Sequence, residues 1–583
     1  MNDSDSPKEL RLKRGSHILN YIRQFSATEK VIFGVLIGIA LVTAIIMAGE
    51  VNGHFMVRVP TDGGNLREGL IGLPRTINPV LAVSDVDHDI TALVYAGLTR
   101  HTPDGIEANL AKSYSVSDDG LTYSFTLKDN LKFQDGTPLT ADDVAFTVGK
   151  VQDPALKSPH AGDWANVTVK VISPTVVQFV LKQAYAPFIS ETDLGILPKH
   201  IWGSVSDDQF IFSQYNIQPV GSGPYKAVSV SRDSGGIPTE YRLSTWSGFA
   251  GTKPHLSNIT FVFFNDDQAA YNALDSGSID SLPSVPPEEA ARLATDTAQG
   301  YTVLSSPLPR IFGVFFNQSQ NPALADKYVR QALDMSVDRT AIVQAVLSGY
   351  GTPIQGPLPA GLSTSTAPAA TSSNIAAAQT LLEKNGWKKD ATTGIYQYQK
   401  KGSKTVTVLS FDIYTADTPD LKQAAELVKN SWAKLGADVS VKVFESSDLY
   451  QTIIRPRKYD ALLFGELIGK DRDLYAFWDS AERNAPGLNV SMYANSKADK
   501  LLDLIRTTSS DSARDAEYAQ FDQLVRADTP AVFLYSPDFI YAVPKTLRGL
   551  ELGGLTVPAD RFDSVTNWYT ETENVWKVFE RYN

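Results

Sequence analysis

Histidines and closely spaced acids are the side chains most able to do chemistry in this 583-residue sequence. No two of the seven histidines are spaced i, i+4, as a zinc-binding metalloprotease helix requires. Asp85, Asp87 and Asp89 have the spacing that opens a calcium loop, but Ile90 replaces the turn glycine and Ala96 the bidentate glutamate. We therefore expect ordinary surface or loop histidines, a solvated acidic turn and no metal site. Beyond the N-terminal segment the histidines are His88, His101, His160, His200 and His255.

Motifs for covalent or phosphate chemistry are missing from the sequence. Gly465 to Lys470 resembles a phosphate loop, but only three residues separate its glycines and no Ser or Thr follows the lysine. There is no G-x-S-x-G elbow and no Ser/Lys acylation motif. Cysteine is absent, which excludes disulfides, thiolate chemistry and a lipid-modified cysteine anchor. Acids are plentiful, but nothing singles out a glycosidase pair. We expect a protein that is not an enzyme and needs no cofactor.

The overall composition is that of a globular protein, with 43% hydrophobic and 20% charged residues. The net charge is −12, and no dense block of Lys and Arg occurs in the bulk of the chain. Nucleic-acid binders usually carry a basic surface, so we expect no nucleic-acid partner. The length exceeds that of a single core and predicts two or three lobes.

An uncharged run from Val31 to Ala48 predicts a transmembrane helix. Its 18 residues span roughly 27 Å as a helix, enough for a thin hydrocarbon core. Six basic and four acidic residues precede the run, and the excess of Lys and Arg places residues 1–30 in the cytoplasm. We expect an uncleaved anchor with everything after Glu50 outside. A cleaved signal peptide is the alternative, although its N-terminal region would be unusually long. A buried soluble helix is disfavoured because the run is apolar all round.

Helices and strands alternate after this segment, which is typical of α/β lobes. Period-two alternation and apolar runs predict strands at Leu121 to Leu127, Thr175 to Leu181, Ile259 to Phe264 and Val439 to Phe444. Helices are predicted over Ala141 to Val148, capped by Thr140, and over Leu421 to Leu435, ended by Gly436.

Several motifs, in order, resemble one known family. The stretch LAKSYSVSDDGLTYSFTLKDNLKFQDGTPLTADDVAFTV, Leu110 to Val148, resembles the signature of the family 5 extracellular solute-binding proteins. Further pieces that resemble the family are Gly221 to Tyr225 (GSGPY), Phe315 to Pro359, Ala376 to Trp387, Tyr459 to Asp473 and Asn489 to Tyr493. Together the resemblance covers about Pro60 to Asn583. These proteins are the peptide- and nickel-binding components of ABC importers.

The resemblance implies a type II periplasmic-binding-protein-like α/β fold in which two lobes close on a ligand and an extra domain is inserted. Lobe I would comprise residues 56–95, 180–300 and 530–583, the inserted domain residues 96–179, and lobe II residues 301–529. The chain is expected to be a monomer with one N-terminal transmembrane helix.

The family also implies a binding site in which an extended peptide pairs with backbone segments like an added strand. The candidate ligand-binding residues are Ser84, Asp85, Phe312, Val314, Gly465, Glu466, Leu467, Lys470, Asp471, Asp473, Asn489 and Tyr535. Family members pair the ligand's amino group with an aspartate in a D-x-x-[DE]-P stretch, and this sequence departs from that pattern. If this stretch is aligned with the family pattern without a gap, Lys470 occupies the amine-binding position, and a lysine there would favour an anionic ligand. If one inserted residue is allowed in the alignment, Asp471 occupies the amine-binding position instead.

An oligopeptide receptor for an ABC importer is the function that the resemblance favours. The expected partners are the permease subunits and, through the helix, the membrane. Within the same family the ligand could instead be an oligosaccharide, a nickel chelate or another anionic solute. A scaffold or receptor without transport is an alternative of a different class, and a secreted hydrolase is the enzymatic one.

Overall fold

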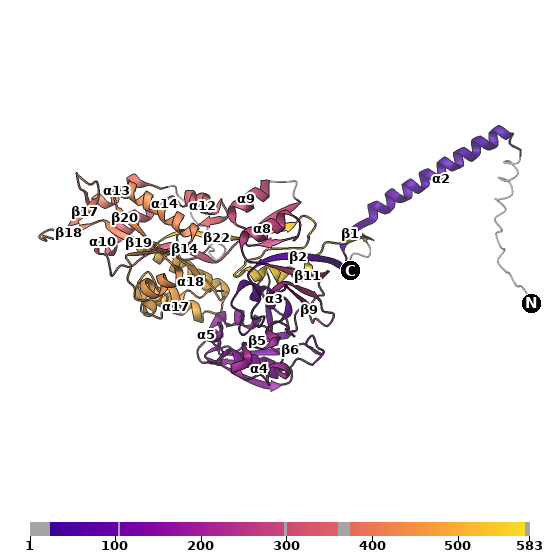
Figure 1. The fold of residues 1–583 in the computed structure, drawn as a ribbon, viewed down its shortest axis with the longest axis horizontal. Coiled ribbons are helices and arrows are strands. Elements are labelled where there is room, and N and C mark those ends of the chain that lie inside the picture. Colours follow the sequence, from indigo (N-terminus) through magenta and orange to yellow (C-terminus); the bar gives the residue numbers. More distant parts are fainter. Residues whose placement is uncertain (1–23, 103–104, 296–299, 360–372, 470, 578–583) are drawn as a thin grey trace, which may run out of the picture. The chain divides into compact units, whose positions relative to one another are not determined.

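The computed structural model describes residues 24–577, apart from 103–104, 296–299, 360–372 and 470. The chain forms two compact units, Met1–Thr61 with Glu571–Asn583, and Asp62–Thr570. Each unit is considered by itself (Figure 1).

The first unit contains helix α2 (Ala27–Phe55), whose apolar side chains lie exposed. Its segment Ala27–Asn52 is the one helix of the described chain that is long and apolar enough to cross a membrane, as an anchor or a signal sequence would be. The predicted span at residues 31–48 lies inside it. Most of the predicted cytoplasmic segment, residues 1–23, lies outside the described residues. Strand β1 (Met56–Pro60) pairs antiparallel with β23 (Thr572–Trp576), so residues from the two ends of the chain form a ribbon.

The second unit begins with a four-stranded sheet in the order β2-β11-β10-β9. Its strands are β2 (Gly63–Ile71), β9 (Tyr225–Arg232), β10 (Pro238–Thr245) and β11 (Leu256–Phe264). Helix α3 (Asp85–Val94) packs on this sheet through Ile90 and Leu93. The GSGPY turn lies against the C-terminal end of α3, where a Cβ at Gly221 would meet the carbonyl oxygen of Val94 at 2.1 Å. This close approach is the physical reason for glycine in the motif.

A buried charge network holds this region together. Arg561, in the 3-10 helix η6 (Pro558–Asn567), donates from Nη1 and Nη2 to the two oxygens of Asp89 at 2.7 Å, and Nη2 also pairs with Glu68. Tyr541 donates to Glu68. The expectation of a solvated acidic turn is therefore wrong: these acids lie on α3, and Asp87 and Asp89 are each 2% exposed.

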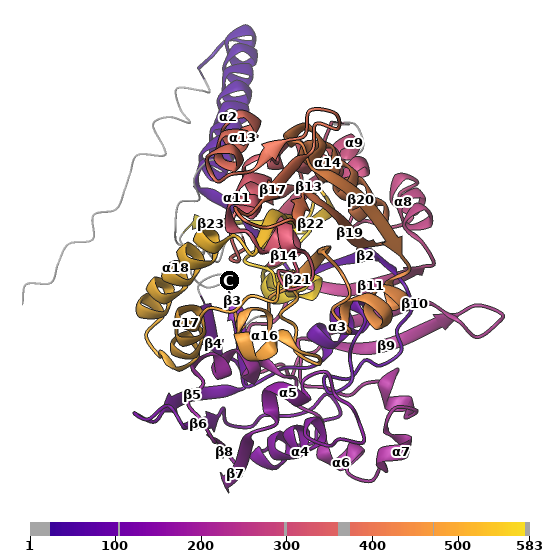
Figure 2. The same cartoon turned by 90° about the vertical axis from the view of Figure 1, so that its left-hand side faces the viewer.

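A second four-stranded sheet, in the order β5-β6-β8-β7, forms the region predicted as an inserted domain. Its strands are β5 (Ala111–Val116), β6 (Thr122–Leu127), β7 (Val167–Ser173) and β8 (Val176–Leu181). The predicted strands here are confirmed, and helix α4 (Ala141–Val151) begins where predicted, with Thr140 N donating to Asp143 at 2.8 Å. Short elements of this region are β3 (Thr99–Thr102), β4 (Gly105–Ala108) and α5 (Ala161–Trp164). The chain continues after β8 with the 3-10 helix η1 (Ala186–Asp193), α6 (Lys199–Trp202), α7 (Asp207–Phe210) and η2 (Gln214–Asn216). Figure 2 shows this sheet and α4 at one end of the unit.

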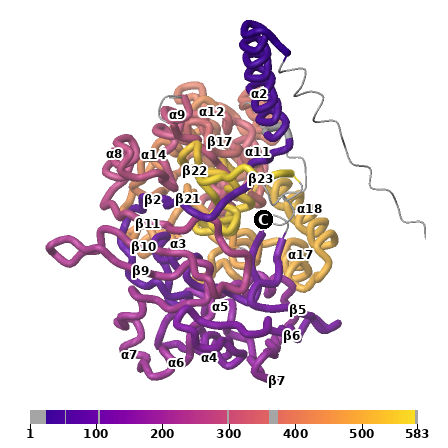
Figure 3. The backbone as a smooth tube through the Cα atoms, turned by 90° about the vertical axis from the view of Figure 1, so that its right-hand side faces the viewer, coloured from indigo at the N-terminus to yellow at the C-terminus, as the bar shows by residue number. Residues whose placement is uncertain are grey.

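The largest sheet has eight strands and contains the path β12-β22-β14-β21-β19-β20, with β13 and β15 also paired to β22. These strands are β12 (Leu282–Pro283), β13 (Tyr301–Pro307), β14 (Arg310–Phe316), β15 (Gly351–Pro353), β19 (Ser410–Ala416), β20 (Asp438–Phe444), β21 (Ala461–Leu467) and β22 (Ala531–Pro544). Strand β22 pairs with β14 through residues 531–535 and with β13 through residues 538–544. This single strand therefore joins two parts of the fold (Figure 3).

Alternate residues of β14 face opposite sides of the sheet, as in any strand. Val314 and Phe316 belong to one core and Ile311 and Phe315 to another. Helices α11–α14 contribute to the first core and α17 and α18 to the second. The helices are α8 (Asp267–Asp275), α9 (Pro287–Thr295), α10 (Pro322–Ala325), α11 (Lys327–Met335), α12 (Arg339–Leu347), α13 (Ile375–Lys384), α14 (Pro419–Leu435), α15 (Ser446–Asp448), η4 (Leu449–Ile454), α16 (Tyr475–Trp478), η5 (Ser480–Arg483), α17 (Ser496–Thr507) and α18 (Asp511–Asp528). Strands β16 (Lys388–Lys389), β17 (Tyr396–Gln399) and β18 (Val406–Val408) form a small sheet.

Candidate functional site

The large sheet brings three of the predicted site residues together. Phe312 on β14 lies opposite Gly465 on β21 and opposite Tyr535 on β22. The rings of Phe312 and Tyr535 stack with their centroids 5.2 Å apart and an interplanar angle of 21°. Tyr535 is 2% exposed, so its ring supports Phe312 from within the core.

The backbone of β14 is not open to a ligand along most of its length. Residues Phe312–Phe315 pair with β22 on one edge and with β21 on the other. Both edges of a central strand are used by the sheet, and the Val314 side chain is buried in the core. The expectation that Phe312 and Val314 present backbone to a ligand therefore needs correction.

Strand β21 has one open edge. It pairs with β14 along its whole length, but on the other side it pairs with β19 only at Ala461 and Leu462. Within the described chain, Gly465–Leu467 has no strand partner on that second edge. Leu467 is 49% exposed there. Unpaired strand edges accept an added extended chain.

The side chain of Glu466 is buried and is not available to a ligand at this strand edge. It is 2% exposed, and Trp478 is the hydrogen-bonding neighbour of its carboxyl group. Burial raises its pKa well above the usual range, by more than a hydrogen bond from Trp478 lowers it, which favours the protonated form. Only the backbone of Glu466 remains for a ligand.

Two other candidate side chains stabilise their own loops. The hydroxyl of Ser84 accepts from the backbone N of Asp87 at 3.1 Å and caps α3, next to the exposed Asp85. Asn489 is fully buried, and its Nδ2 donates to carbonyl oxygens of Trp478, Asp479 and Tyr493. The Asn489 side chain is thus structural, which corrects its assignment to the site.

The predicted acidic loop contacts a residue from a distant part of the chain. Asp471 accepts a hydrogen bond from the Tyr185 hydroxyl at 2.5 Å, and Asp473 pairs with Arg506 of α17 at 3.0 Å. The carbonyl of Tyr185 accepts in turn from Tyr123 at 3.0 Å. The loop therefore lies between α17 and the start of η1. Lys470, the alternative anchor, lies outside the described residues.

A cavity of about 460 Å³ opens on one side of this loop. Its charged lining consists of Asp163, Asp471, Asp473, Asp503, Lys182 and Arg506. Burial, and then the charges of Asp471 and Asp473, raise the pKa of Asp163 to about 6. Sequence reasoning missed Asp163 and Asp503, because nothing in their spacing relates them to the loop.

A larger cavity of about 680 Å³ lies on the other side of Asp471. It reaches Ser306, Pro307 and Pro309, where the chain passes from β13 to β14. Its carboxylates are Asp471, Asp511, Asp515, Glu551, Asp560 and Asp563, against the two arginines Arg472 and Arg514. The volume of this cavity lies within the range of small-molecule binding sites. The excess of carboxylates over arginines favours a ligand with a cationic group.

Comparison with known proteins agrees with this architecture. Residues 105–485 match the bacterial extracellular solute-binding proteins, family 5. The oligopeptide-binding protein AppA of Bacillus subtilis is 29% identical over 511 residues, covering 84% of this chain and 89% of the relative. Protein XP55 of Streptomyces lividans is 30% identical, with 83% and 85% covered.

Solved structures give the same result. The ABC transporter substrate-binding protein CtaP of Listeria monocytogenes is 27% identical, with a TM-score of 0.73 over 88% of this chain and 100% of that one. AppA of Bacillus subtilis in complex with a nonapeptide is 27% identical, with a TM-score of 0.65 over 88% and 99%. The chain has their two-lobed α/β fold and belongs to the bacterial extracellular solute-binding proteins of family 5.

Proposed function

We propose that this protein is a membrane-anchored extracytoplasmic receptor that captures an oligopeptide between its lobes and delivers it to an ABC importer. The observation that carries the proposal is the open edge of β21 at Gly465–Leu467, which leads within a few residues to Asp471 beside the two acidic cavities. One relative is an oligopeptide-binding protein and its solved structure holds a nonapeptide, which supports a peptide as the ligand.

The open edge of β21 fits the main chain of a peptide, and Asp471 fits its amino group. An extended main chain pairs with a strand edge without reading side chains, which gives affinity for many sequences. The amino group of the peptide is cationic and binds favourably to a carboxylate. Asp473 already pairs with Arg506, whereas no Lys or Arg of the described chain pairs with Asp471. Asp471 is therefore the proposed anchor for the amino group.

The division into lobes is part of the same proposal. Residues 56–95, 180–300 and 530–583 form lobe I, 96–179 the inserted domain and 301–529 lobe II. Strand β22 and the β13–β14 segment run between the two lobes and are the proposed hinge. The cavity beside Ser306–Pro309 lies where closure would act.

The length and apolar composition of α2 support the proposed anchoring. Protease added to intact spheroplasts should digest the bulk of the chain and leave a small membrane-protected fragment. Protection of the bulk would contradict the proposed topology. Release of the whole chain into the medium would indicate a cleaved signal sequence instead.

Peptide capture is tested on the full chain in detergent micelles. Native mass spectrometry of the purified protein should reveal co-purified peptides. Calorimetry with one of them should show binding to a single site, and acetylating its amino terminus should weaken binding. If only non-peptide molecules co-purify and no peptide binds, the ligand class proposed here is wrong.

A further inference from the structure

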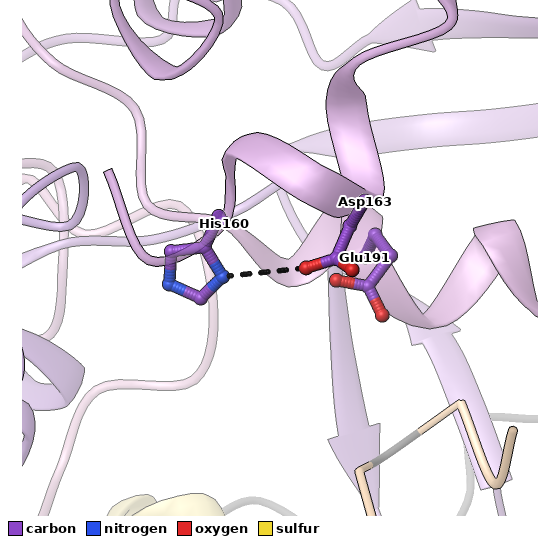
Figure 4. A group of neighbouring side chains, drawn as sticks. All are labelled: His160, Asp163 and Glu191. Atoms are coloured by element: carbon purple, nitrogen blue, oxygen red, sulfur yellow. Dashed lines mark ion pairs between the residues drawn. The ribbon is translucent and has the colours of Figure 1, made fainter. Parts of the chain in front are cut away.

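One group of potential metal ligands lies outside the proposed peptide contacts. His160 precedes the short helix α5, Asp163 lies within it, and Glu191 lies on η1. One ligand atom from each side chain lies within 4.8 Å of the other two. Figure 4 shows the carboxylates of Asp163 and Glu191 next to each other, with the His160 ring facing Asp163. No other such group occurs in the described part of the chain.

Asp163 lies among other carboxylates of the loop and cavity. His160 Nδ1 lies 4.0 Å from Asp163 Oδ2, and no Lys or Arg of the described residues pairs with Asp163. Asp163 also faces the 460 Å³ cavity that Asp471 and Asp473 line. Like charges so placed repel one another, and a bound cation would relieve that repulsion.

We propose that His160, Asp163 and Glu191 bind one divalent transition-metal ion, with Zn²⁺ as the fitting probe. One imidazole nitrogen and two carboxylate oxygens are the donors that such ions accept, whereas Ca²⁺ and Mg²⁺ prefer oxygen alone. Three protein ligands leave a fourth position for water or a ligand group.

The observed spacing needs only a small adjustment for this role. With each donor about 2.1 Å from the ion, donors in one shell lie roughly 3–3.5 Å apart. The side chains of His160 and Asp163 are 33% and 44% exposed, so they can rotate without disturbing the core. His160 and Asp163 are spaced i, i+3, so the pattern of two histidines at i, i+4 does not include them.

The ion would add a cationic point to the wall of an acidic cavity. A ligand carrying both an amino group and a carboxylate could then meet Asp471 on one side and the metal's open position on the other. The inference goes beyond peptide capture and does not require it, because the three ligands come from α5 and η1 and not from β21.

The test uses the full chain in detergent, purified without a polyhistidine tag, stripped with a chelator and dialysed. Titration with Zn²⁺ by calorimetry should show one ion per chain, with Ca²⁺ binding at least tenfold more weakly. His160→Ala and Glu191→Gln should each weaken Zn²⁺ binding at least tenfold. Circular dichroism checks that both variants are folded, and Glu191→Gln retains the side-chain shape.

His200→Ala is the matched control. Its Nε2 lies 2.7 Å from Asp135, so it removes a similar histidine–aspartate pair from the same region without touching the three-residue group. Zn²⁺ affinity should be unchanged in this variant. If the wild type binds no Zn²⁺, or if all three variants bind it like the wild type, the proposed site does not exist. Peptide calorimetry without metal tests the transport proposal separately.

Discussion

Replacing Asp471 by asparagine removes one negative charge from the loop between the two cavities and leaves the side chain nearly the same size. In the wild type its carboxylate accepts from Tyr185 at 2.5 Å, and burial together with the loop aspartates raises the pKa of that tyrosine. Asp473 is the poorer candidate because Arg506 offsets its charge at 3.0 Å. The variant therefore isolates the carboxylate that we assign to the peptide's amino group.

The expected loss of peptide affinity follows from removal of a hydrogen bond between two charged groups. A hydrogen bond between charged groups contributes about 1.5–3 kcal/mol net. At room temperature this corresponds to roughly 10- to 150-fold in Kd. Asp471→Asn should weaken a peptide with a free amino group by this factor, and should hardly change the binding of the same peptide after N-acetylation.

Calorimetry on the full chain with both peptides and both proteins forms a double-mutant cycle, which measures the coupling between Asp471 and the amino group. Asp503→Asn is the control, since it removes a carboxylate from the 460 Å³ cavity but not from the loop. Equal losses in the two variants would mean that the cavity attracts cations only through its general charge. Unchanged affinity in Asp471→Asn, combined with weaker binding of an anionic ligand in Lys470→Ala, would favour the alternative anchor.

Three further predictions concern the fold and use chemical denaturation of the full chain in detergent. Arg561→Met leaves two buried carboxylates without their cation and should lower the free energy of unfolding by about 3–5 kcal/mol, whereas Lys253→Met breaks an exposed pair and should cost at most about 1 kcal/mol. Burial raises the pKa of Glu466 well above its usual value, so this group should lower the free energy of unfolding as pH rises above its unfolded-state pKa, by up to about 1.4 kcal/mol per pH unit. Glu466→Gln should remove that contribution, and parallel pH dependences of wild type and variant would contradict the raised pKa. Gly223→Ala places a Cβ 2.5 Å from the carbonyl oxygen of Leu93 and should destabilise by about 1–3 kcal/mol, and no loss would mean that the turn can shift.

Local features of the chain were predictable because they depend on neighbouring residues. The strand periodicities at residues 121–127 and 175–181 appear as β6 and β8, and the helix ended by Gly436 appears as α14, with that glycine at a φ of 113°. Order and spacing of motifs also led to the family and its two-lobed fold. Each of these periodicities and motifs lies within one continuous stretch of the chain.

Contacts between distant segments were not predictable in the same way. Asp89 was expected in a solvated turn, but it pairs with Arg561, which lies 472 residues further along the chain. Phe312 and Val314 were expected to pair with a ligand through their backbone, but β21 and β22 occupy both edges of their strand. Asp163 meets the Asp471 loop across some three hundred residues, and no local pattern links the two. The sequence by itself determined the elements, the apolar helix and the family. Only the tertiary structure decided which strand edge stays open and which acids share a cavity, because both depend on how segments far apart in the chain pack against one another.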